Sequence, residues 1–368
     1  MMIKSLNVLA LMSGTSFETI KYALISTDGV DIYQTYLSGT IPMPEFLRSK
    51  IELIVGKNIN LPDDEILINA VENDVTQLMI DIIRELLASC RQKVDLIGIE
   101  GPTITHNVQE HYTYQLGKGK QIFEEFRIPT VSHFHNTDMA NGGQGAPIAA
   151  TYYHALALHI PKPALFINIG GVSSLTYIGA LGEMIAFDCG PGNTILNHFM
   201  IKHAHVAMDY NGQMAALGKA DLKIVAGLMR HNFFEKRPPK ALDRNSFKDK
   251  EEHFEGLSIE DGAATIVEFI AEAIKKAIIE MLPSRPETVL ICGGGALNPT
   301  LVRVLKQKLK EEGITAFVLH DDVKPDDAAA FAFLAARRFY HLPITFPSTT
   351  GVSAPLSGGK LYDKENIQ

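Results

Sequence analysis

Asp188-Cys189-Gly190-Pro191-Gly192-Asn193 follows an apolar, strand-like run and sets a carboxylate among glycines. Three other corners of the chain also join glycine to small hydroxyl or amide side chains: Met12-Ser13-Gly14-Thr15-Ser16, Asn168-Ile169-Gly170-Gly171 and Cys292-Gly293-Gly294-Gly295. Glycine lets the backbone approach a ligand closely, and backbone N–H groups in such turns bind phosphate oxygens. A single turn of this kind means little, but several predict one cleft, assembled from distant segments, that holds a polyphosphate. We therefore expect a nucleotide-using enzyme.

Length and composition indicate a globular protein of two domains. The chain has 368 residues, more than one ordinary core accommodates, so we expect the chemistry in a cleft between domains. Hydrophobic residues make up 46% and charged residues 21%, with no stretch polar enough to be disordered. The formal net charge is −8 and Lys and Arg do not cluster, which argues against nucleic acid or a membrane as partner.

Cysteine usage and the N-terminus favour a cytoplasmic protein. Cys90, Cys189 and Cys292 are widely spaced and form no CxxC pair, so we expect neither a disulfide framework nor a zinc site. The apolar run at residues 6–12 is too short for a secretory signal. No run approaches the roughly 20 residues that span a bilayer.

Hydrophobic periodicity in the first half predicts a β-meander followed by a long helix. Asp28-Gly29 is a typical hairpin corner, and Asp63 or Asp64 is placed to cap the helix. A polar, glycine-containing stretch at residues 137–147 is interpreted as the hinge. The expected elements are strands at 7–12, 22–27, 32–39 and 96–99 and helices at about 67–86 and 149–158.

The second half repeats this pattern. Ser258 lies three residues before Asp261, the spacing of a capping box, and Asn298 is expected to cap a helix that begins at Pro299. Residues 231–256, rich in charge, Pro and Asn, are interpreted as an excursion over the cleft. The expected elements are strands at 165–169, 174–178, 184–187 and 289–292 and a helix at 260–282.

Eight short motifs occur along the chain in this order: MSGTS (12–16), GGQGAP (142–147), NIGG (168–171), FDCGPGN (187–193), PPK (238–240), CGGGALNP (292–299), AAAFAFLA (328–335) and PSTTG (347–351). The series resembles the anhydro-N-acetylmuramic acid kinase family over nearly the whole chain. Each motif alone would be a weak signal, whereas their common order makes the resemblance specific.

The resemblance implies an α/β, actin-like and ribonuclease-H-like fold of the sugar kinase, Hsp70 and actin type. Two domains would flank a central interdomain cleft. One would span residues 1–142 plus about 345–368, and the other, 143–344, would carry the catalytic aspartate and the adenosine motif. The implied activity is that of an ATP- and Mg²⁺-dependent kinase. It couples hydrolytic opening of a 1,6-anhydro sugar to phosphorylation of O6 in cell-wall (murein) recycling.

Asp188 matches the family aspartate that acts as base on the water attacking C1. A strand-end position beside glycines would expose its carboxylate to the reacting atoms. The alternative is an aspartate that only caps a turn at Gly190. Phosphoryl transfer needs positioning and charge neutralisation, so the lack of a covalent nucleophile is no objection.

The nucleotide would be held by the glycine corners. Phosphate oxygens would meet Ser13, Gly14, Thr15 and Ser16, with an ordinary strand-to-strand turn as the alternative. The β- and γ-phosphates would approach Gly170, Gly171, Gly190 and Gly192, where close packing of two hairpins is the alternative. Adenosine would lie against Gly293, Gly294 and Gly295, and Asn298 is interpreted as a helix cap rather than a ligand.

The chain departs from the family pattern in the phosphate loop. Glu18 stands where the family has Asp, Thr19 replaces Gly, and Lys21 replaces a second Asp. Near the C-terminus, Asp327 stands where the family has Glu. Glu18 and Asp327 are candidate Mg²⁺ ligands whose exchanged lengths could preserve their reach. Each could instead be a solvated charge.

The sugar side also departs from the family. Glu100 begins Glu100-Gly101-Pro102-Thr103 where the family has His-Gly-Gln-Thr, and His135 replaces an Arg while Asp138 is retained. Ala241-Leu242-Asp243-Arg244 replaces Ser-Thr-Gly-Arg. The candidate substrate residues are Glu100, His135, Asp138, Gln144 and Asp327. A histidine metal site at His133, His135, His198, His203 and His205 is not expected, because no Cys or carboxylate completes a ligand set.

Two further interpretations stay open at this point. A divergent member could phosphorylate a different sugar, or a non-catalytic member could bind nucleotide or sugar as a sensor of cell-wall turnover. Thr19 and Lys21 are the residues that favour the sensor. The expected partner is a small-molecule sugar, and a homodimer is expected only by analogy with the fold.

Overall fold

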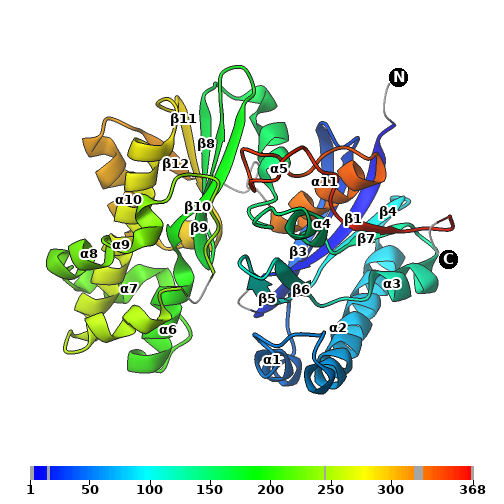
Figure 1. Ribbon diagram of the computed structural model, residues 1–368, viewed down its shortest axis with the longest axis horizontal. Coiled ribbons are helices and arrows are strands. Elements are labelled where there is room, and N and C mark those ends of the chain that lie inside the picture. Colours follow the sequence, from blue (N-terminus) through cyan, green and yellow to red (C-terminus); the bar gives the residue numbers. More distant parts are fainter. Residues whose placement is uncertain (1–3, 15–16, 244–245, 319–325, 366–368) are drawn as a thin grey trace. The chain divides into compact units, whose positions relative to one another are not determined.

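The computed structural model describes residues 4–14, 17–243, 246–318 and 326–365, and the chain forms two compact units. Unit 1 comprises residues 1–156 and 326–368, and unit 2 comprises residues 157–325. Figure 1 follows the chain through both units by colour. Each unit is built on one β-sheet.

Unit 1 has a six-stranded sheet in the order β13-β7-β4-β1-β2-β3. β1, β2 and β3 form the predicted antiparallel meander, and β4 and β7 then add in parallel. The strands are β1 Leu6–Ser13, β2 Thr19–Thr27, β3 Ile32–Pro42, β4 Leu96–Glu100, β7 Thr130–Ser132 and β13 Lys360–Tyr362. A separate hairpin joins β5 (Thr103–Asn107) and β6 (Tyr112–Gln115).

Unit 2 repeats this plan in a five-stranded sheet of order β10-β9-β8-β11-β12. β8, β9 and β10 form an antiparallel meander, and β11 and β12 add in parallel, as β4 and β7 do in unit 1. The strands are β8 Ala164–Ile169, β9 Val172–Ile178, β10 Met184–Pro191, β11 Thr288–Cys292 and β12 Ala316–Val318. The duplicated strand order confirms the predicted actin-like, ribonuclease-H-like fold class.

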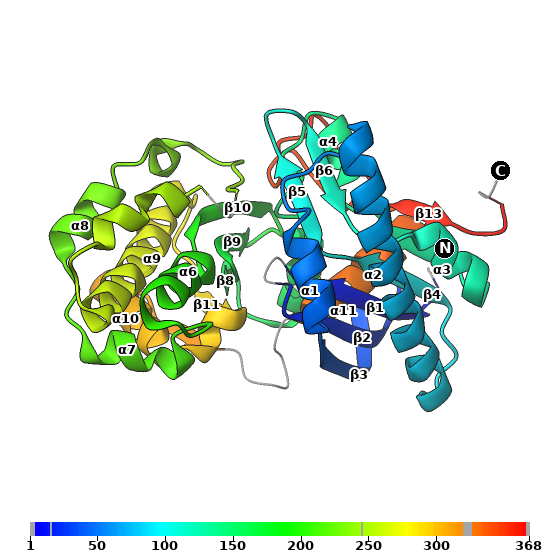
Figure 2. The ribbon, with the colours of Figure 1, turned by 90° about the horizontal axis from the view of Figure 1, so that it is seen from below.

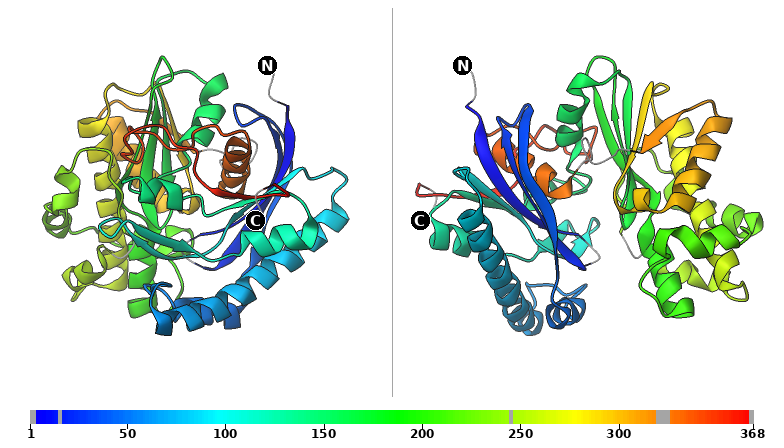
Figure 3. Two further views of the ribbon diagram at one scale, coloured as in Figure 1. Left: turned by 45° about the vertical axis from the view of Figure 1, so that its right-hand side comes forward. Right: turned by 180° about the vertical axis from the view of Figure 1, so that it is seen from behind.

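Helices cover both faces of the sheet of unit 1. Alternation along β1 directs Leu9 and Leu11 into the core under α2, whereas Val8 and Ala10 pack with the alanine-rich α11. Figure 3 shows α2 and α11 on opposite faces of this sheet. The helices are α1 Glu45–Glu52, α2 Pro62–Ser89, α3 Gly119–Phe126, α4 Asn136–Ala140, α5 Ala150–Leu156 and α11 Asp327–Phe339.

In unit 2, α9 is the central helix and contacts α6, α7, α8 and α10 (Figure 2). The helices are α6 Asn193–Ala204, α7 Gln213–Leu217, α8 Leu222–Leu228, α9 Ile259–Met281 and α10 Pro299–Glu311. Short 3-10 turns span Ala157–His159, Tyr210–Gly212, Asn232–Glu235, Lys248–Phe254 and Gly294–Leu297. In the part of the chain that the structure describes, no helix has the length and apolarity needed to cross a membrane.

Helix caps were predicted with mixed success. Ser258 accepts a hydrogen bond from Asp261 N at 3.1 Å, and Asn298 accepts one from Leu301 N at 3.0 Å, so both predicted caps are confirmed. The prediction that Asp63 or Asp64 caps α2 is wrong. That helix begins at Pro62, and Asp64 instead accepts from Lys57 Nζ at 2.6 Å.

The structure divides the chain at points other than those the sequence indicated. Residues 143–156 and 326–344, which the sequence placed in the second domain, belong to unit 1. The reason is packing, because Tyr152 of α5 and the buried face of α11 share one hydrophobic cluster with β1. The stretch at 137–147, interpreted as the hinge, lies inside unit 1.

The segment 231–256 was interpreted as a polar excursion, but its aromatic residues belong to the core of unit 2. Phe233, Phe234 and Phe247 are buried, and the rings of Phe234 and Phe247 pack edge-on against Phe269 of α9 at 5.8 and 5.5 Å. Charged residues lie between these aromatics, so the hydrophobic periodicity did not indicate that the segment packs into the core.

Candidate active site

Asp188 lies within β10, where the register to β9 shifts between Asp188 and Gly190. Its backbone N–H donates to Lys240 O at 2.9 Å, and its Oδ2 accepts from Leu242 N at 2.8 Å. Two bonds to one neighbouring segment therefore fix the orientation of the carboxylate. No other hydrogen bond to the side chain joins it to a described residue.

The surroundings of Asp188 correct one expectation. The carboxylate was expected to be exposed at a strand end, but Asp188 is 7% exposed and the strand continues to Pro191. Burial raises its pKa to about 7, against the opposing effects of the Leu242 N–H and the Lys240 ammonium. The turn-cap alternative fails as well, because Gly190 lies in the strand. A carboxylate that titrates near neutral pH suits a general base.

Lys240 neighbours Asp188, a placement that the sequence did not reveal. It is 3% exposed, and its Nζ donates to Phe233 O at 3.1 Å and lies 4.3 Å from the centre of the Phe233 ring. Burial lowers its pKa to about 8, while Cys189 and Asp188 oppose that shift. The PPK motif pointed to this lysine, but only the fold brings it beside Asp188.

Asp188 shares a row of the sheet with two residues that precede glycine corners. Asp188 pairs with Ser174, Ser174 with Asn168, and Asn168 with Cys292. The three glycine corners of unit 2 therefore meet near the row that holds Asp188. This part of the predicted assembly is present.

Close packing explains much of the glycine in these corners. A Cβ on Gly192 would lie 2.3 Å from Gly170 O, and one on Gly293, whose φ is +80°, would lie 2.3 Å from Asn168 Oδ1. A Cβ on Gly190 would lie 2.7 Å from Ala273 of α9. These glycines are required by neighbouring protein atoms, as the packing alternative held, and their contact with phosphate stays a prediction.

Several backbone N–H groups in the corners of unit 2 are already hydrogen-bonded to carbonyls of the same corners. Asn193 N donates to Gly170 O at 2.7 Å, and the N–H groups of Gly192 and Thr194 donate to Gly171 O. The first N–H groups of α6 are thus occupied by protein carbonyls. Gly294 is more open, because a Cβ there would meet only Asn193 Nδ2 at 3.4 Å, whereas one on Gly295 would lie 2.3 Å from Ile169.

The first glycine corner lies at the end of β1 in unit 1. Ser13 is buried and its Oγ donates to Thr19 O at 3.2 Å, so its hydroxyl closes the β1–β2 connection. A Cβ on Gly14 would meet nothing within 4 Å, which leaves this backbone accessible. Thr15 and Ser16 lie outside the described residues.

Asp327 and Lys21 form an ion pair in unit 1. Lys21 Nζ lies 2.5 Å from Asp327 Oδ2, and the two side chains are 39% and 32% exposed. Burial alone would lower the pKa of Lys21, but the charges of Asp327 and Asp326 raise it above its ordinary value. The carboxylate at 327 is therefore neutralised by this chain's own ammonium.

This ion pair bears on the candidate metal ligands. A cation already contacts Asp327, and no cluster of three or more His, Cys, Asp or Glu residues suited to a metal occurs among the described residues. Glu18 makes its main-chain contact through its carbonyl, which accepts from Met43 N at 2.8 Å. The donor set around Asp327 does not fit a directly bound Mg²⁺.

Four of the five substrate candidates, namely Glu100, His135, Asp138 and Gln144, gather at the end of β4, whereas Asp327 pairs with Lys21. His135 donates through Nδ1 to Gly145 O at 2.5 Å, and its Nε2 lies 2.9 Å from Glu100 Oε1. Asp138 is fully buried and accepts from Gly145 N at 2.7 Å and from Thr350 Oγ1 at 2.5 Å. Gln144 joins the group through its backbone, because its N–H donates to Thr350 O at 2.8 Å.

These contacts separate the sugar-side candidates by role. Both oxygens of Asp138 are used to hold the loop at Gly145 and Thr350, which indicates a structural anchor. Glu100 is different, since its second oxygen, Oε2, is buried and has no hydrogen-bond partner among the described residues.

Comparison with known proteins then decides the family. A model of the family described as anhydro-N-acetylmuramic acid kinase matches residues 6–364. The chain belongs to this family. Two proteins named anhydro-N-acetylmuramic acid kinase, from Acidiphilium cryptum and from Rhodopseudomonas palustris strain HaA2, are each 36% identical to it. The alignments cover 97% of this chain and 98% and 99% of those proteins.

Solved structures give a much fainter likeness to this member of the anhydro-N-acetylmuramic acid kinase family. A ROK family glucokinase from Streptomyces griseus, in complex with glucose and AMPPNP, is 11% identical, with a TM-score of 0.42. The match covers 90% of this chain and 98% of that one. The fold of this chain follows from its own strand order.

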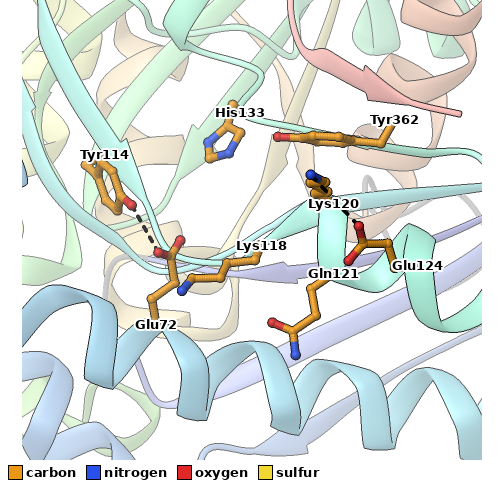
Figure 4. Close-up of a pocket in the computed structure, with 8 residues that line it drawn as sticks. All are labelled: Glu72, Tyr114, Lys118, Lys120, Gln121, Glu124, His133 and Tyr362. Atoms are coloured by element: carbon orange, nitrogen blue, oxygen red, sulfur yellow. Dashed lines mark hydrogen bonds and ion pairs between the residues drawn. The ribbon is translucent and has the colours of Figure 1, made fainter. Parts of the chain in front are cut away.

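The structure also shows a cavity of 460 Å³ in unit 1 that contains none of the predicted site residues (Figure 4). Glu72 on its wall is buried and satisfied, because Tyr114 OH and Gly117 N donate to its two oxygens, each at 3.0 Å. Burial raises the pKa of Glu72. The lining residues are Glu72, Tyr114, Lys118, Lys120, Gln121, Glu124, His133 and Tyr362.

Proposed function

We propose that Asp188 is the general base with which this family member opens a 1,6-anhydro sugar and phosphorylates its O6. Membership of the family makes the protein an anhydro-N-acetylmuramic acid kinase, a carbohydrate phosphotransferase. The observation that carries the proposal is the position of Asp188 in the same sheet row as two glycine corners. Its pKa of about 7 supports proton transfer near neutral pH.

The chemistry assigns one proton transfer to Asp188. The carboxylate takes a proton from water as the water oxygen bonds to C1 of the sugar and the C1–O6 bond breaks. The electron pair of the broken bond stays on O6, which takes the phosphoryl group from ATP and leaves ADP. Because the Leu242 N–H holds Oδ2, the carboxylate meets the water in one orientation, and little reorganisation is needed.

ATP is the phosphoryl donor in this proposal, and the glycine corners of unit 2 are its candidate contacts. Gly170 and Gly294 are the more open positions there, each with a single contact at 3.4 Å for an added Cβ, whereas Gly190 and Gly192 are enclosed by protein. Mg²⁺ would accompany the phosphates with most of its ligands supplied by them and by water. The residues around Asp327 do not fit that ion, because the ammonium of Lys21 already contacts the carboxylate.

We further propose a cytoplasmic location and a homodimer, with neither nucleic acid nor a membrane as partner. These properties fit a kinase that acts on a small molecule. The non-catalytic sensor finds no support in the comparisons, whose named relatives are kinases.

The test is ADP release in the presence of anhydro-N-acetylmuramic acid. Asp188→Asn should lower kcat by about 10²- to 10⁴-fold, because the base is lost while the Leu242 bond can persist. Asp209→Asn is the matched control. Asp209 is also buried in unit 2 and accepts from Met214 N and Ala215 N, so its loss should affect stability and not the chemical step.

Three results would contradict the proposal. One is the absence of any sugar-dependent ADP release by the wild-type protein. The others are an Asp188→Asn variant with the wild-type rate, or an equal loss in Asp209→Asn at matched folding. The last of these would assign the effect to the integrity of unit 2.

A further inference from the structure

Glu100 carries a buried oxygen that the protein leaves unpaired. The residue ends β4 and is 3% exposed. Its Oε1 accepts from His135, but Oε2 has no donor among the described residues although it is shielded from solvent. Buried carboxylate oxygens are almost always hydrogen-bonded, and an unpaired one is costly.

His135 holds the other oxygen of this carboxylate, because its Nε2 lies 2.9 Å from Glu100 Oε1. A carbonyl only accepts hydrogen bonds, so the contact with Gly145 O requires a proton on Nδ1. Burial alone would lower the pKa of His135. The charge and hydrogen bond of Glu100, the Gly145 carbonyl and the charge of Asp138 together raise it above its ordinary value. When it is protonated, the ring donates to Gly145 O on one side and to Glu100 Oε1 on the other.

The neighbouring polar groups are already engaged with one another. Asp138 accepts from Gly145 and Thr350, and His106 contacts Gln144 O at 2.9 Å and Thr113 Oγ1 at 3.1 Å. The rings of His106 and Phe331 lie 6.3 and 6.4 Å from that of His135, so α11 presents an apolar ring to the pair. No described donor is therefore available to Oε2.

We infer that Glu100 Oε2 accepts a hydrogen bond from a hydroxyl or amide N–H of the bound sugar, with His135 as the positioning residue. The inference rests on the proposed function, which supplies a sugar as the ligand. The inference also predicts the orientation of the bound sugar. The carboxylate of the lactyl group must lie away from Glu100, because two carboxylates repel one another.

Glu72 provides a matched control within the same unit. It is equally buried, but both of its oxygens have donors, namely Tyr114 OH and Gly117 N. Its removal should lower the free energy of unfolding and leave sugar affinity unchanged. Glu100→Gln keeps an oxygen for His135, so it should weaken sugar binding and change the free energy of unfolding little.

The experiment measures the affinity for anhydro-N-acetylmuramic acid by titration calorimetry, which suits a chain without tryptophan. Glu100→Leu removes the acceptor and should weaken binding roughly 10- to 100-fold. Glu100→Gln keeps a neutral acceptor and should give a smaller loss. Wild-type affinity should fall as pH rises through the raised pKa of His135, and the Gln variant should lose this pH dependence.

Each outcome bears on a different statement. If the wild type binds the sugar, but Glu100→Gln and Glu100→Leu bind it equally well, Oε2 holds only a structural water and the inference is overturned. If affinity follows thermal stability across the Glu100 and Glu72 variants, the role is structural and the inference is also overturned. If the wild type binds no sugar, the proposed function falls together with the inference.

Discussion

The two sheets share strand order and direction, but different types of residue lie at the ends of their strands. In unit 2 the corners after β8 and β10 are closed by backbone contacts between Gly192 and Gly170-Gly171, and Gly293 after β11 packs against Asn168 and Ile169. In unit 1 the corresponding region carries charged side chains, with Glu100 bound to His135 and Lys21 bound to Asp327. The same strand order thus carries close-packed glycine turns in unit 2 and paired charged side chains in unit 1.

This difference coincides with four of the departures that the family resemblance indicates. The glycine motifs of unit 2 are constrained by neighbouring backbone, so a side chain at Gly192 has no space. Four positions of unit 1 that the resemblance marks as departures contact one another in pairs, Glu100 with His135 and Lys21 with Asp327. Paired side chains can change together without moving the strands that carry them.

The largest expected effect concerns the buried charge of unit 2. Because folding raises the pKa of Asp188 from 3.8 to about 7, the folded state binds its proton more tightly. The free energy of unfolding should therefore fall as the pH rises from about 4 to about 7. Asp188→Asn should recover up to about 4 kcal/mol at pH 8, as measured by denaturant unfolding. A variant less stable than the wild type at pH 8 would show that the carboxylate stabilises the fold.

The same carboxylate should set the acid limb of activity. Protonated Asp188 cannot accept a proton, so kcat/KM for the sugar should fall about tenfold per unit below pH 7 and roughly 100-fold by pH 5. Activity recovered after return to pH 8 controls for acid unfolding. A profile that stays flat to pH 5 would remove Asp188 from the role of base.

Alanine at two glycines tests the contrast in packing directly. Gly192→Ala should destabilise the protein by about 1–3 kcal/mol, because the new Cβ meets Gly170 O. Gly14→Ala in unit 1 should stay within about 0.5 kcal/mol, because its Cβ would meet open space. Thermal unfolding of both variants measures this, and equal effects would contradict the difference between the two edges.

The smallest effect is expected at the ion pair of unit 1. Lys21→Met should change the free energy of unfolding by less than about 1 kcal/mol, because both partners are partly solvated. Lys50→Met, which breaks the surface pair with Asp74, is the control. A loss above about 2 kcal/mol for Lys21→Met alone would show that the pair supports the packing of α11.

Local patterns predicted the strands of both meanders and the Ser258 and Asn298 caps, because alternation and capping depend on residues close in sequence. The start of α2 was missed, since Pro62 fits the first turn of a helix and displaces the cap that Asp64 was expected to provide. The domain limits were missed because α11 packs on β1 although the two segments lie far apart in the sequence. No local pattern indicates that contact.

The candidate site was predicted in outline and not in its contacts. The motifs identified Asp188 and the glycine corners that meet in unit 2. They did not show that Asp188 is buried, because burial depends on the distant segment at Lys240 and Leu242. The partner of Lys21 lies 306 residues away in the sequence, and no spacing rule reaches so far.

The division of unit 1 into two stretches of chain has a consequence during synthesis. The ribosome synthesises residues 157–325 before it makes α11, so all of unit 2 is translated while the first sheet still lacks the helix that covers Val8 and Ala10. Nascent chains ending near residue 325 should therefore expose that apolar face. The earliest strands to be translated are among the last to be fully buried.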